Sequence, residues 1–216
     1  MLITFKYMIK HISFALLAAV ASVLIGCSST KKSTKGHSAY LFNGKNTKGW
    51  IAANGGTWSV EEGFLIGSNG QGWSTDPQKS GSWLRTQRPY NDFLLELEYS
   101  INQGGNSGIF IRSGLEKNPA FTGYEIQILD DHGKPPSKST SGALYDVVAP
   151  TRNMSRPAGE WNEVRVLVKG TKVQVSLNGV LVVDTEATRA TNGFVGLQAH
   201  DEKSRVRFRN VRLTEL

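Results

Sequence analysis

The sequence lacks several groups on which whole classes of protein depend. Cysteine occurs only once, at Cys27, so no disulfide can form within the chain. The apolar run of residues 12–26 carries no charge, yet it is shorter than the roughly 20 residues of a membrane-spanning helix. No dense Asp/Asn loop has the spacing of a calcium site, and no histidine pair has that of a zinc site. We therefore predict no disulfide framework and assign no metal site.

Basic residues outnumber acidic residues without forming the pattern of a nucleic-acid-binding protein. The chain has 25 Lys and Arg against 18 Asp and Glu, which gives a formal net charge of +7. The basic residues are scattered among acidic ones, and no basic stripe is interleaved with aromatic residues. No glycine loop has the strand and helix context of a phosphate-binding motif. We therefore expect no nucleic-acid partner.

The apolar run near the N-terminus has the pattern of a signal peptide. Lys6 and Lys10 precede the run, and small residues end it just before Cys27. Its last residues, Val-Leu-Ile-Gly-Cys, resemble a bacterial lipobox, and this resemblance implies cleavage before Cys27 and lipidation of that cysteine. The alternatives are an uncleaved hydrophobic anchor and a cysteine without a special role.

These observations divide the chain into three parts. We interpret residues 1–26 as a lipoprotein signal peptide and residues 27–38, rich in Ser, Thr, Lys and Gly, as a flexible tether. Residues 39–216 have a length that suits one all-β domain. We expect the protein to lie in the bacterial cell envelope, facing the periplasm or the cell surface, with membrane contact only through its lipid anchor.

The domain shows many signals of short β-strands and hardly any of helices. Roughly a dozen apolar or alternating segments are separated by turns rich in Gly, Pro, Asn and Asp. Residues 93–101 and 161–169 alternate between an apolar and a polar face, and Trp161 indicates a core anchor before its strand. Turn residues predict hairpins at residues 61–63 and 178–179. This pattern predicts an all-β fold, a sandwich of two antiparallel sheets.

Two long polar segments, residues 67–82 and 131–142, are predicted to be loops, and residues 142–145 a short strand. The first loop carries Trp73. An indole in such a loop can stack on the apolar face of a sugar ring. The alternative is that Trp73 packs at the edge of the core.

A polar pair in the middle of one predicted strand marks the leading candidate for a working surface. Because side chains alternate along a strand, Glu125 and Gln127 point to one face. An ionised group within a sheet is costly unless it is paired or functional. The alternative is an exposed outer face, where Glu and Gln are ordinary. The opposite face of this strand is apolar and predicted to be core, with Tyr124, Ile126 and Ile128.

Further polar residues lie on strands predicted nearby. Gln198 and His200 share a face of the segment of residues 194–200, opposite its apolar residues. Asn106 and Arg112 lie at the two ends of another predicted strand. Asn106 lines the site or shapes the turn before it, and His200 is a site residue or a capping residue of its loop.

The order of short motifs resembles the 3-keto-disaccharide hydrolase domain family over about Tyr40 to Leu216. This resemblance implies a concanavalin A-like lectin/glucanase jelly roll and an enzyme that cleaves glycosides already oxidised to a ketone at C3. Lectins of this fold often hold Ca²⁺, and we leave that cation open without committing to it. The motifs are Leu41-Phe-Asn-Gly44, Gly105-Asn-Ser-Gly-Ile-Phe-Ile-Arg112, Glu125-x-Gln-x-x-Asp130, Gly142-Ala-Leu-Tyr145, Gly159-Glu-Trp-Asn162, Asn178-Gly179, Gly196-Leu-Gln-x-His200 and Phe208-Arg-Asn-Val-Arg212.

The strand of Glu125 does not fit ordinary retaining hydrolysis. That reaction uses two carboxylates that flank the bond, and glucanases of this fold often place them at i and i+4 on one strand. Here the same face has Glu125, Gln127 and then Leu129, so the second carboxylate is missing from this strand. A carboxylate from another strand would be required.

A 3-keto-glycoside needs only one base, because its ketone acidifies the C2–H bond. We predict Glu125 as the base and His200 or Tyr145 as the proton donor to the leaving oxygen. Arg112 and Gln127 are predicted to hold the oxygens of the ketone and the enediolate. The other predicted substrate contacts are Asp130, Asn106, Gln198 and Trp73.

Other interpretations of these residues remain open. Arg112 would also suit a salt bridge, with Asp130 as a candidate partner, and Tyr145 would also suit a buried aromatic site. With carbohydrate as the expected partner, the alternative function is a non-catalytic carbohydrate-binding module on the same sandwich. A third interpretation is an envelope scaffold without a ligand.

Overall fold

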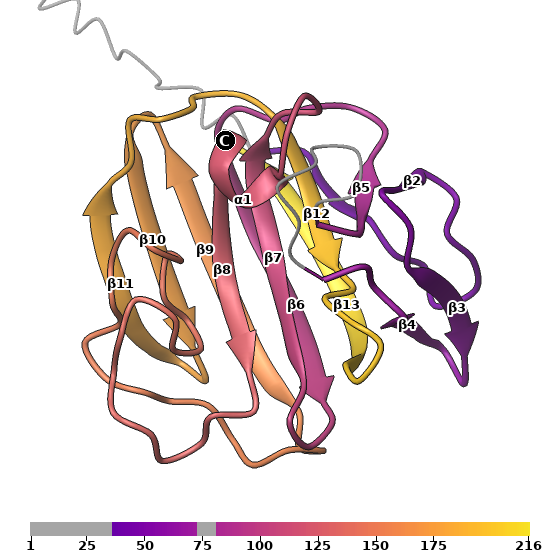
Figure 1. Cartoon of the computed structure of the whole chain (residues 1–216). Coiled ribbons are helices and arrows are strands. Elements are labelled where there is room, and N and C mark those ends of the chain that lie inside the picture. Colours follow the sequence, from indigo (N-terminus) through magenta and orange to yellow (C-terminus); the bar gives the residue numbers. More distant parts are fainter. Residues whose placement is uncertain (1–35, 73–80) are drawn as a thin grey trace, which may run out of the picture. The chain divides into compact units, whose positions relative to one another are not determined.

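Two antiparallel sheets face each other across an apolar core (Figure 1). The computed structural model describes residues 36–72 and 81–216, which all belong to the compact unit Thr34–Leu216. The described elements are β1 (Ser38–Tyr40), β2 (Trp50–Ala53), β3 (Thr57–Glu61), β4 (Phe64–Ser68), β5 (Trp83–Thr86), β6 (Phe93–Ile101), β7 (Asn106–Ser113), α1 (Pro119–Thr122), β8 (Tyr124–Leu129), β9 (Asn162–Lys169), β10 (Lys172–Leu177), β11 (Val180–Glu186), β12 (Phe194–Gln198) and β13 (Arg205–Glu215).

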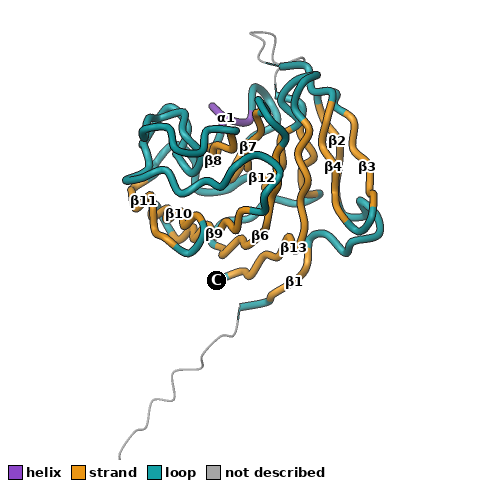
Figure 2. The backbone as a smooth tube through the Cα atoms, turned by 90° about the horizontal axis from the view of Figure 1, so that it is seen from below, coloured by secondary structure: helices purple, strands orange, loops and turns teal. Residues whose placement is uncertain are grey.

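The two sheets differ in size and are built from strands distant in sequence. The larger sheet has eight strands in the order β11-β10-β9-β6-β13-β4-β3, with β1 paired to β13. The smaller sheet has five strands in the order β2-β5-β12-β7-β8. Figure 2 shows the row from β11 to β13 as one layer and β8, β7 and β12 as the layer facing it. The predicted two-sheet antiparallel sandwich is confirmed.

The core lies between the sheets and follows from strand alternation. Every second residue of β6 is buried at 3% exposure or less, while Leu94, Glu96 and Glu98 lie on the outer face. Fully burying side chains of this size stabilises the fold by about 1.5–3 kcal/mol each. The same alternation in β8 buries Ile126 and Ile128, as predicted. The core residues contributed by β6 are Phe93, Leu95, Leu97, Tyr99 and Ile101.

The connections hold two differences from the sequence prediction. The segment before β8 contains the short helix α1, which Asn118 caps by accepting a hydrogen bond from the Ala120 N–H. Residues 142–145 are not a strand, because Gly142 has a left-handed φ of +84° and only Leu144 forms isolated bridges. Among the described residues, no helix is long and apolar enough to cross a membrane.

Candidate functional site

A cleft with about 400 Å³ of open volume lies on the outer face of the smaller sheet. Strands β7, β8 and β12 form its floor, because their polar residues alternate with residues that enter the core. Helix α1 crosses this side of the sheet in Figure 1. The residues that line the cleft are Gly72, Gly81, Asn106, Asn118, Ala120, Phe121, Glu125, Gln127, Tyr145, Gln198 and His200.

Glu125 is the buried acid of this cleft. The residue is only 4% exposed, and its carboxyl group has no hydrogen bond or ion pair with any described residue. Burial without a compensating partner disfavours the charged form and raises the pKa of Glu125 to about 8. A carboxyl group in this state is a stronger base than an exposed glutamate once it has lost its proton.

Gly108 makes the space that Glu125 occupies. Gly108 lies on β7 opposite Gln127, two residue pairs from the pair of Phe110 and Glu125. A Cβ atom at position 108 would lie 2.1 Å from Glu125 Oε1 and 2.8 Å from its Cδ. The missing side chain therefore allows the carboxyl group to lie flat over the neighbouring strand.

Two amide side chains lie beside the acid on the floor of the cleft. Gln127 is 4% exposed, and its Nε2 donates a hydrogen bond of 3.1 Å to Asn106 Oδ1. Gln198, on the neighbouring β12, is 6% exposed, and its Oε1 has no hydrogen-bond partner among the described residues. A buried polar atom without a partner is rare and is costly in the empty cleft. The arrangement suits a ligand that carries hydroxyl groups.

His200 lies where β12 runs into the next loop, and Asp201 orients its ring. The distance from His200 Nδ1 to Asp201 Oδ2 is 2.8 Å. The other oxygen of Asp201 accepts hydrogen bonds from the backbone N–H groups of Lys203 and Ser204 at 3.0 and 2.8 Å. Although burial opposes it, these contacts hold the pKa of Asp201 below its ordinary value. The ionised Asp201 thus fixes one ring nitrogen and leaves Nε2 of His200 for other partners.

Two aromatic rings form the opposite wall. Tyr145 is held beside β8 because its backbone N–H donates to the Glu125 carbonyl at 2.8 Å, and Gly142 N–H donates to the Gln127 carbonyl at 2.9 Å. Phe121 of α1 is 43% exposed, and its ring centroid lies 6.4 Å from that of Tyr145. Exposed aromatic rings of this kind offer apolar faces to a sugar.

The structure brings six of the predicted residues together and leaves two, Arg112 and Asp130, outside the cleft. Arg112 is 1% exposed, and its guanidinium donates to the carbonyls of Asn91 and Gly170 and forms an ion pair of 3.0 Å with Asp92. A left-handed φ of +51° at Arg112 interrupts the alternation of β7 and turns the side chain away. The predicted residues that line the cleft are Glu125, Gln127, Asn106, Gln198 and His200, joined by Tyr145 from its loop.

Asp130 also lies away from the cleft, and it is not the partner of Arg112. Its Oδ2 accepts a hydrogen bond of 2.8 Å from the Gly104 N–H in the neighbouring turn. The neighbouring Asp131 anchors the long loop after β8, because it accepts hydrogen bonds from Ser141 and Ser155. Trp73 and Cys27 lie outside the described residues.

The sequence reasoning missed Asp201, Gly108 and Phe121. Asp201 follows His200 directly, and adjacent His and Asp residues after a strand were the available signal. Phe121 belongs to a four-residue helix that no periodicity could reveal. In the described part of the chain, no three His, Cys, Asp or Glu residues gather in a way that would hold a metal ion.

The chain is similar to proteins that act on oxidised sugars. Residues 38–214 match the family described as 3-keto-alpha-glucoside-1,2-lyase-like domain. A 3-keto-disaccharide hydrolase of Bacteroides thetaiotaomicron is 29% identical over 155 residues, which cover 62% of this chain and 53% of that protein. The chain therefore spans about half the length of this relative.

Solved structures support the fold over most of the domain. A glycosyl hydrolase candidate from Parabacteroides distasonis has a TM-score of 0.70 and 26% identity, covering 83% of this chain and 94% of its own. A carbohydrate-binding module from Bacillus subtilis has a TM-score of 0.56 and 18% identity over 76% of this chain and 94% of its own. A Bacillus subtilis protein with a galectin-like fold has a TM-score of 0.58 and 13% identity over 83% and 94%. The sandwich is thus of the galectin and concanavalin A-like lectin type.

Proposed function

Because the chain belongs to the family of 3-keto-alpha-glucoside-1,2-lyase-like domains, we propose that it cleaves the glycosidic bond of 3-keto-glycosides in the cleft around Glu125. One observation carries the proposal. A carboxyl group with 4% exposure and no partner among the described residues faces a cleft, and its burial raises the pKa of Glu125 to about 8. Such a group is suited to removing a weakly acidic proton.

The reaction starts with the proton at C2 of the sugar. The C3 ketone acidifies this C–H bond, and Glu125 accepts the proton while the electron pair moves into an enediolate. The enediolate then forms the C1–C2 double bond as the bond from C1 to the leaving oxygen breaks. Water adds to the product if the net reaction is hydrolysis.

Amide groups on the cleft floor take the role of holding the developing oxyanion. The prediction gave this role to Arg112 and Gln127, and only Gln127 lies in the cleft. Gln198 is the second candidate, because its amide lies on the cleft floor and its Nε2 can donate a hydrogen bond, while its unpaired Oε1 can only accept one, from a sugar hydroxyl. Hydrogen-bond donors fixed in a water-poor site stabilise a developing oxyanion more than they do in water.

The leaving oxygen needs a proton donor. His200 is the better positioned candidate, because Asp201 holds its Nδ1 at 2.8 Å and a ring oriented in this way presents Nε2 as the transferring atom. Tyr145 also lines the cleft, and its hydroxyl group has no hydrogen bond to a described residue. Tyr145 and Phe121 together offer apolar faces to the sugar rings.

The cleft favours this chemistry over the two main alternatives. Ordinary retaining hydrolysis needs a second carboxylate about 5–5.5 Å from the first, and Glu125 is the only carboxyl residue that lines the cleft in the described part of the chain. A non-catalytic sugar-binding module gains nothing from an unpaired buried acid, because the acid weakens the fold when it ionises. The burial of Glu125 therefore favours an enzyme.

The test is a comparison of two matched substrates. The purified protein is incubated with a 3-keto-disaccharide and, separately, with its unoxidised parent, and released monosaccharide is measured. The proposal predicts release from the 3-keto-disaccharide only. Equal release from both, or binding of both without any cleavage, would reject the proposed chemistry.

We also propose that Cys27 carries a lipid that anchors the protein in the cell envelope. The support is the sequence pattern alone, a basic start, an apolar run and a lipobox-like end. In cells, the wild-type protein should fractionate with membranes and Cys27→Ser should not. Equal distribution of the two proteins would remove the proposal.

A further inference from the structure

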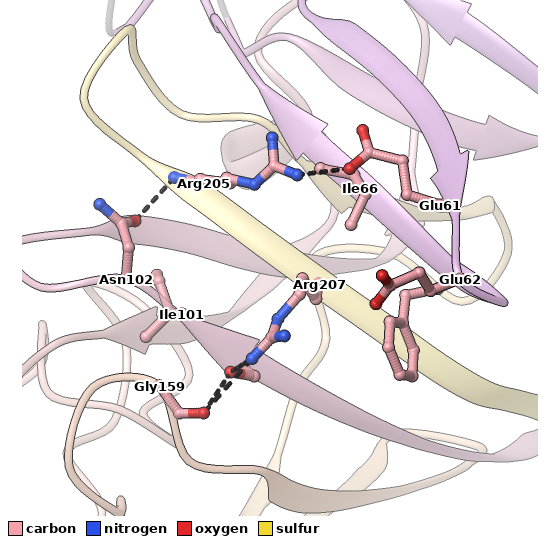
Figure 3. Close-up of a pocket in the computed structure, with 10 residues that line it drawn as sticks. Glu61, Glu62, Ile66, Ile101, Asn102, Gly159, Arg205 and Arg207 are labelled. Carbon is pink, nitrogen blue, oxygen red and sulfur yellow. Dashed lines mark hydrogen bonds and ion pairs between the residues drawn. The ribbon is translucent and has the colours of Figure 1, made fainter.

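A second hollow, with about 800 Å³ of open volume, lies on the outer face of the larger sheet (Figure 3). It is formed by the β3–β4 hairpin, the end of β6, the first residues of β13 and the turn at Gly159. None of its residues belongs to the Glu125 cleft. The residues that line it are Glu61, Glu62, Phe64, Ile66, Ser100, Ile101, Asn102, Gly159, Arg205 and Arg207.

Arg207 differs from the three other arginines of β13 that pair with glutamates. Arg205 pairs with Glu61 at 2.7 Å, and Arg209 and Arg212 pair with Glu98 and Glu96 at 2.5 Å each. Arg207 has no acidic partner within the described part of the chain. A half-buried guanidinium without a counter-charge retains donors for a ligand.

The Arg207 guanidinium is held in place although it is unpaired. Its Nη2 donates to Ser100 Oγ at 2.9 Å and to the Gly159 carbonyl at 3.4 Å. Its Cζ atom also lies over two aromatic rings, 5.2 Å from the centroid of Trp161 and 5.9 Å from that of Phe64. Trp161 was predicted as a core anchor, but it is half-buried on this outer face. A group fixed in this way loses little entropy when a ligand binds.

Glu62 supplies the complementary group. It lies in the β3–β4 turn with a left-handed φ of +51°, and its carboxylate has no hydrogen bond or ion pair with a described residue. In Figure 3 the carboxylate of Glu62 lies on one side of the hollow, and the guanidinium of Arg207 lies on the other side, next to Gly159. The two glutamates and two arginines of the hollow cancel in formal charge, so it favours neither an anion nor a cation.

We propose that this hollow is a second saccharide-binding site, which takes a neutral sugar segment separately from the Glu125 cleft. Glu62 accepts hydrogen bonds from sugar hydroxyls, and Arg207 donates hydrogen bonds to sugar oxygens. The ring of Phe64 offers an apolar surface beside them. The inference stands on the hollow alone and requires no activity in the cleft.

The test uses two neutral probes, maltotriose and cellotriose, with backbone amide NMR spectra of the full domain. At up to about 10 mM sugar, above the millimolar Kd expected of a small open site, at least one probe should shift the amides of residues 64–66, 100–102 and 205–207. Arg207→Gln and Glu62→Gln should each weaken this binding by about tenfold or more, because each removes a charged hydrogen-bonding partner. Arg212→Gln, on the same strand but outside the hollow, is the matched control and should leave binding unchanged.

Cleavage of a 3-keto-disaccharide is measured in parallel and should be equal in all four proteins. This readout separates a failure of the second site from a failure of the proposed enzyme activity. Three results would overturn the proposal. In the first, neither neutral sugar shifts the amides of the hollow. In the second, the shifts persist in both Arg207→Gln and Glu62→Gln. In the third, an added anionic probe, sodium glucuronate, shifts these amides while the neutral sugars do not, which would make the hollow an anion site.

Discussion

Gly108 and Glu125 share one small space on neighbouring strands of the smaller sheet. A Cβ atom at position 108 would lie 2.1 Å from Glu125 Oε1, well inside contact distance. Gly108 has no left-handed φ, so a need for conformational freedom does not explain why a glycine occupies this position. The space it leaves is what allows a carboxyl group to lie buried and unpaired on the cleft floor.

Gly108→Ala should therefore lower activity without unfolding the protein. Alanine suits the extended backbone of β7, and the atoms it would meet belong to the end of a flexible side chain. Glu125 is expected to shift by an ångström or more, and a misplacement of this size costs on the order of 100-fold in rate. Steady-state kinetics on a 3-keto-disaccharide give the loss, and circular dichroism checks the fold.

The double variant Gly108→Ala/Glu125→Gln separates this effect from a general disturbance of the cleft. If Gly108 acts only through Glu125, the double variant should be no less active than Glu125→Gln alone. If the double variant instead loses activity by the product of the two single-variant factors, Gly108 affects activity independently of Glu125.

Glu125→Gln should stabilise the protein at alkaline pH. The pKa of Glu125 rises from 4.5 in the unfolded chain to about 8 in the folded state, so the folded state binds the proton more tightly. Wild-type stability from this group is complete below about pH 4.5 and is lost as pH rises through about 8. The variant cannot ionise, and its advantage should grow with pH to at most about 5 kcal/mol above pH 8. Urea unfolding at pH 5 and pH 9 measures it, and an equal stability difference at both values would contradict the burial of an unpaired acid.

Strand alternation was sufficient to predict where the floor of the cleft lies. Alternation places Glu125 and Gln127 on the face of β8 opposite Tyr124 and Ile126, and it places Gln198 on the face of β12 that points away from the core. These residues lie in regular pairing, where a period of two holds. The face on which a side chain lies depends only on its own strand, so it can be predicted without knowing which strands pair with each other.

Alternation fails where the backbone leaves regular pairing. At Arg112 the left-handed φ ends the alternation of side chains between the two faces of β7. The Arg112 side chain reaches backbone carbonyls that are distant in the sequence. Phe121 and Asp201 reach the cleft from a short helix and a loop, whose paths depend on tertiary packing. No local pattern encodes such contacts.

Asp201→Asn should lower kcat by about 10²-fold or more with little change in KM. The amide can no longer hold the ring of His200 in one protonation arrangement, and loss of an oriented acid–base group costs 10²–10⁴-fold. The pH dependence of kcat should also shift, which a purely structural defect would not produce. Asp130→Asn, outside the cleft, is the control and should keep both kinetic constants.

Arg112→Met should destabilise the fold by about 3–5 kcal/mol. The Arg112 side chain is 1% exposed, and its removal takes the guanidinium away from the Asn91 and Gly170 carbonyls and from the Asp92 carboxylate, which is 37% exposed. Arg88→Met removes an exposed ion pair with Glu215 and should cost less than about 1 kcal/mol. Chemical unfolding measures both, and equal costs would show that Arg112 is not a structural centre. The folded fraction of Arg112→Met should keep the KM of the wild type, because Arg112 does not line the cleft.

Isotope labelling at C2 shows whether Glu125 removes the proton from that carbon. A 3-keto-disaccharide that carries deuterium at C2 is cleaved by wild type and by Glu125→Gln across a pH range around 8, and both sugar release and label loss are followed. Wild type should cleave the sugar with loss of the label and a primary isotope effect, and faster as pH rises through about 8. Glu125→Gln should neither cleave the sugar nor remove the label. Cleavage by the wild type with the deuterium retained at C2, or undiminished cleavage by Glu125→Gln, would contradict proton removal by Glu125.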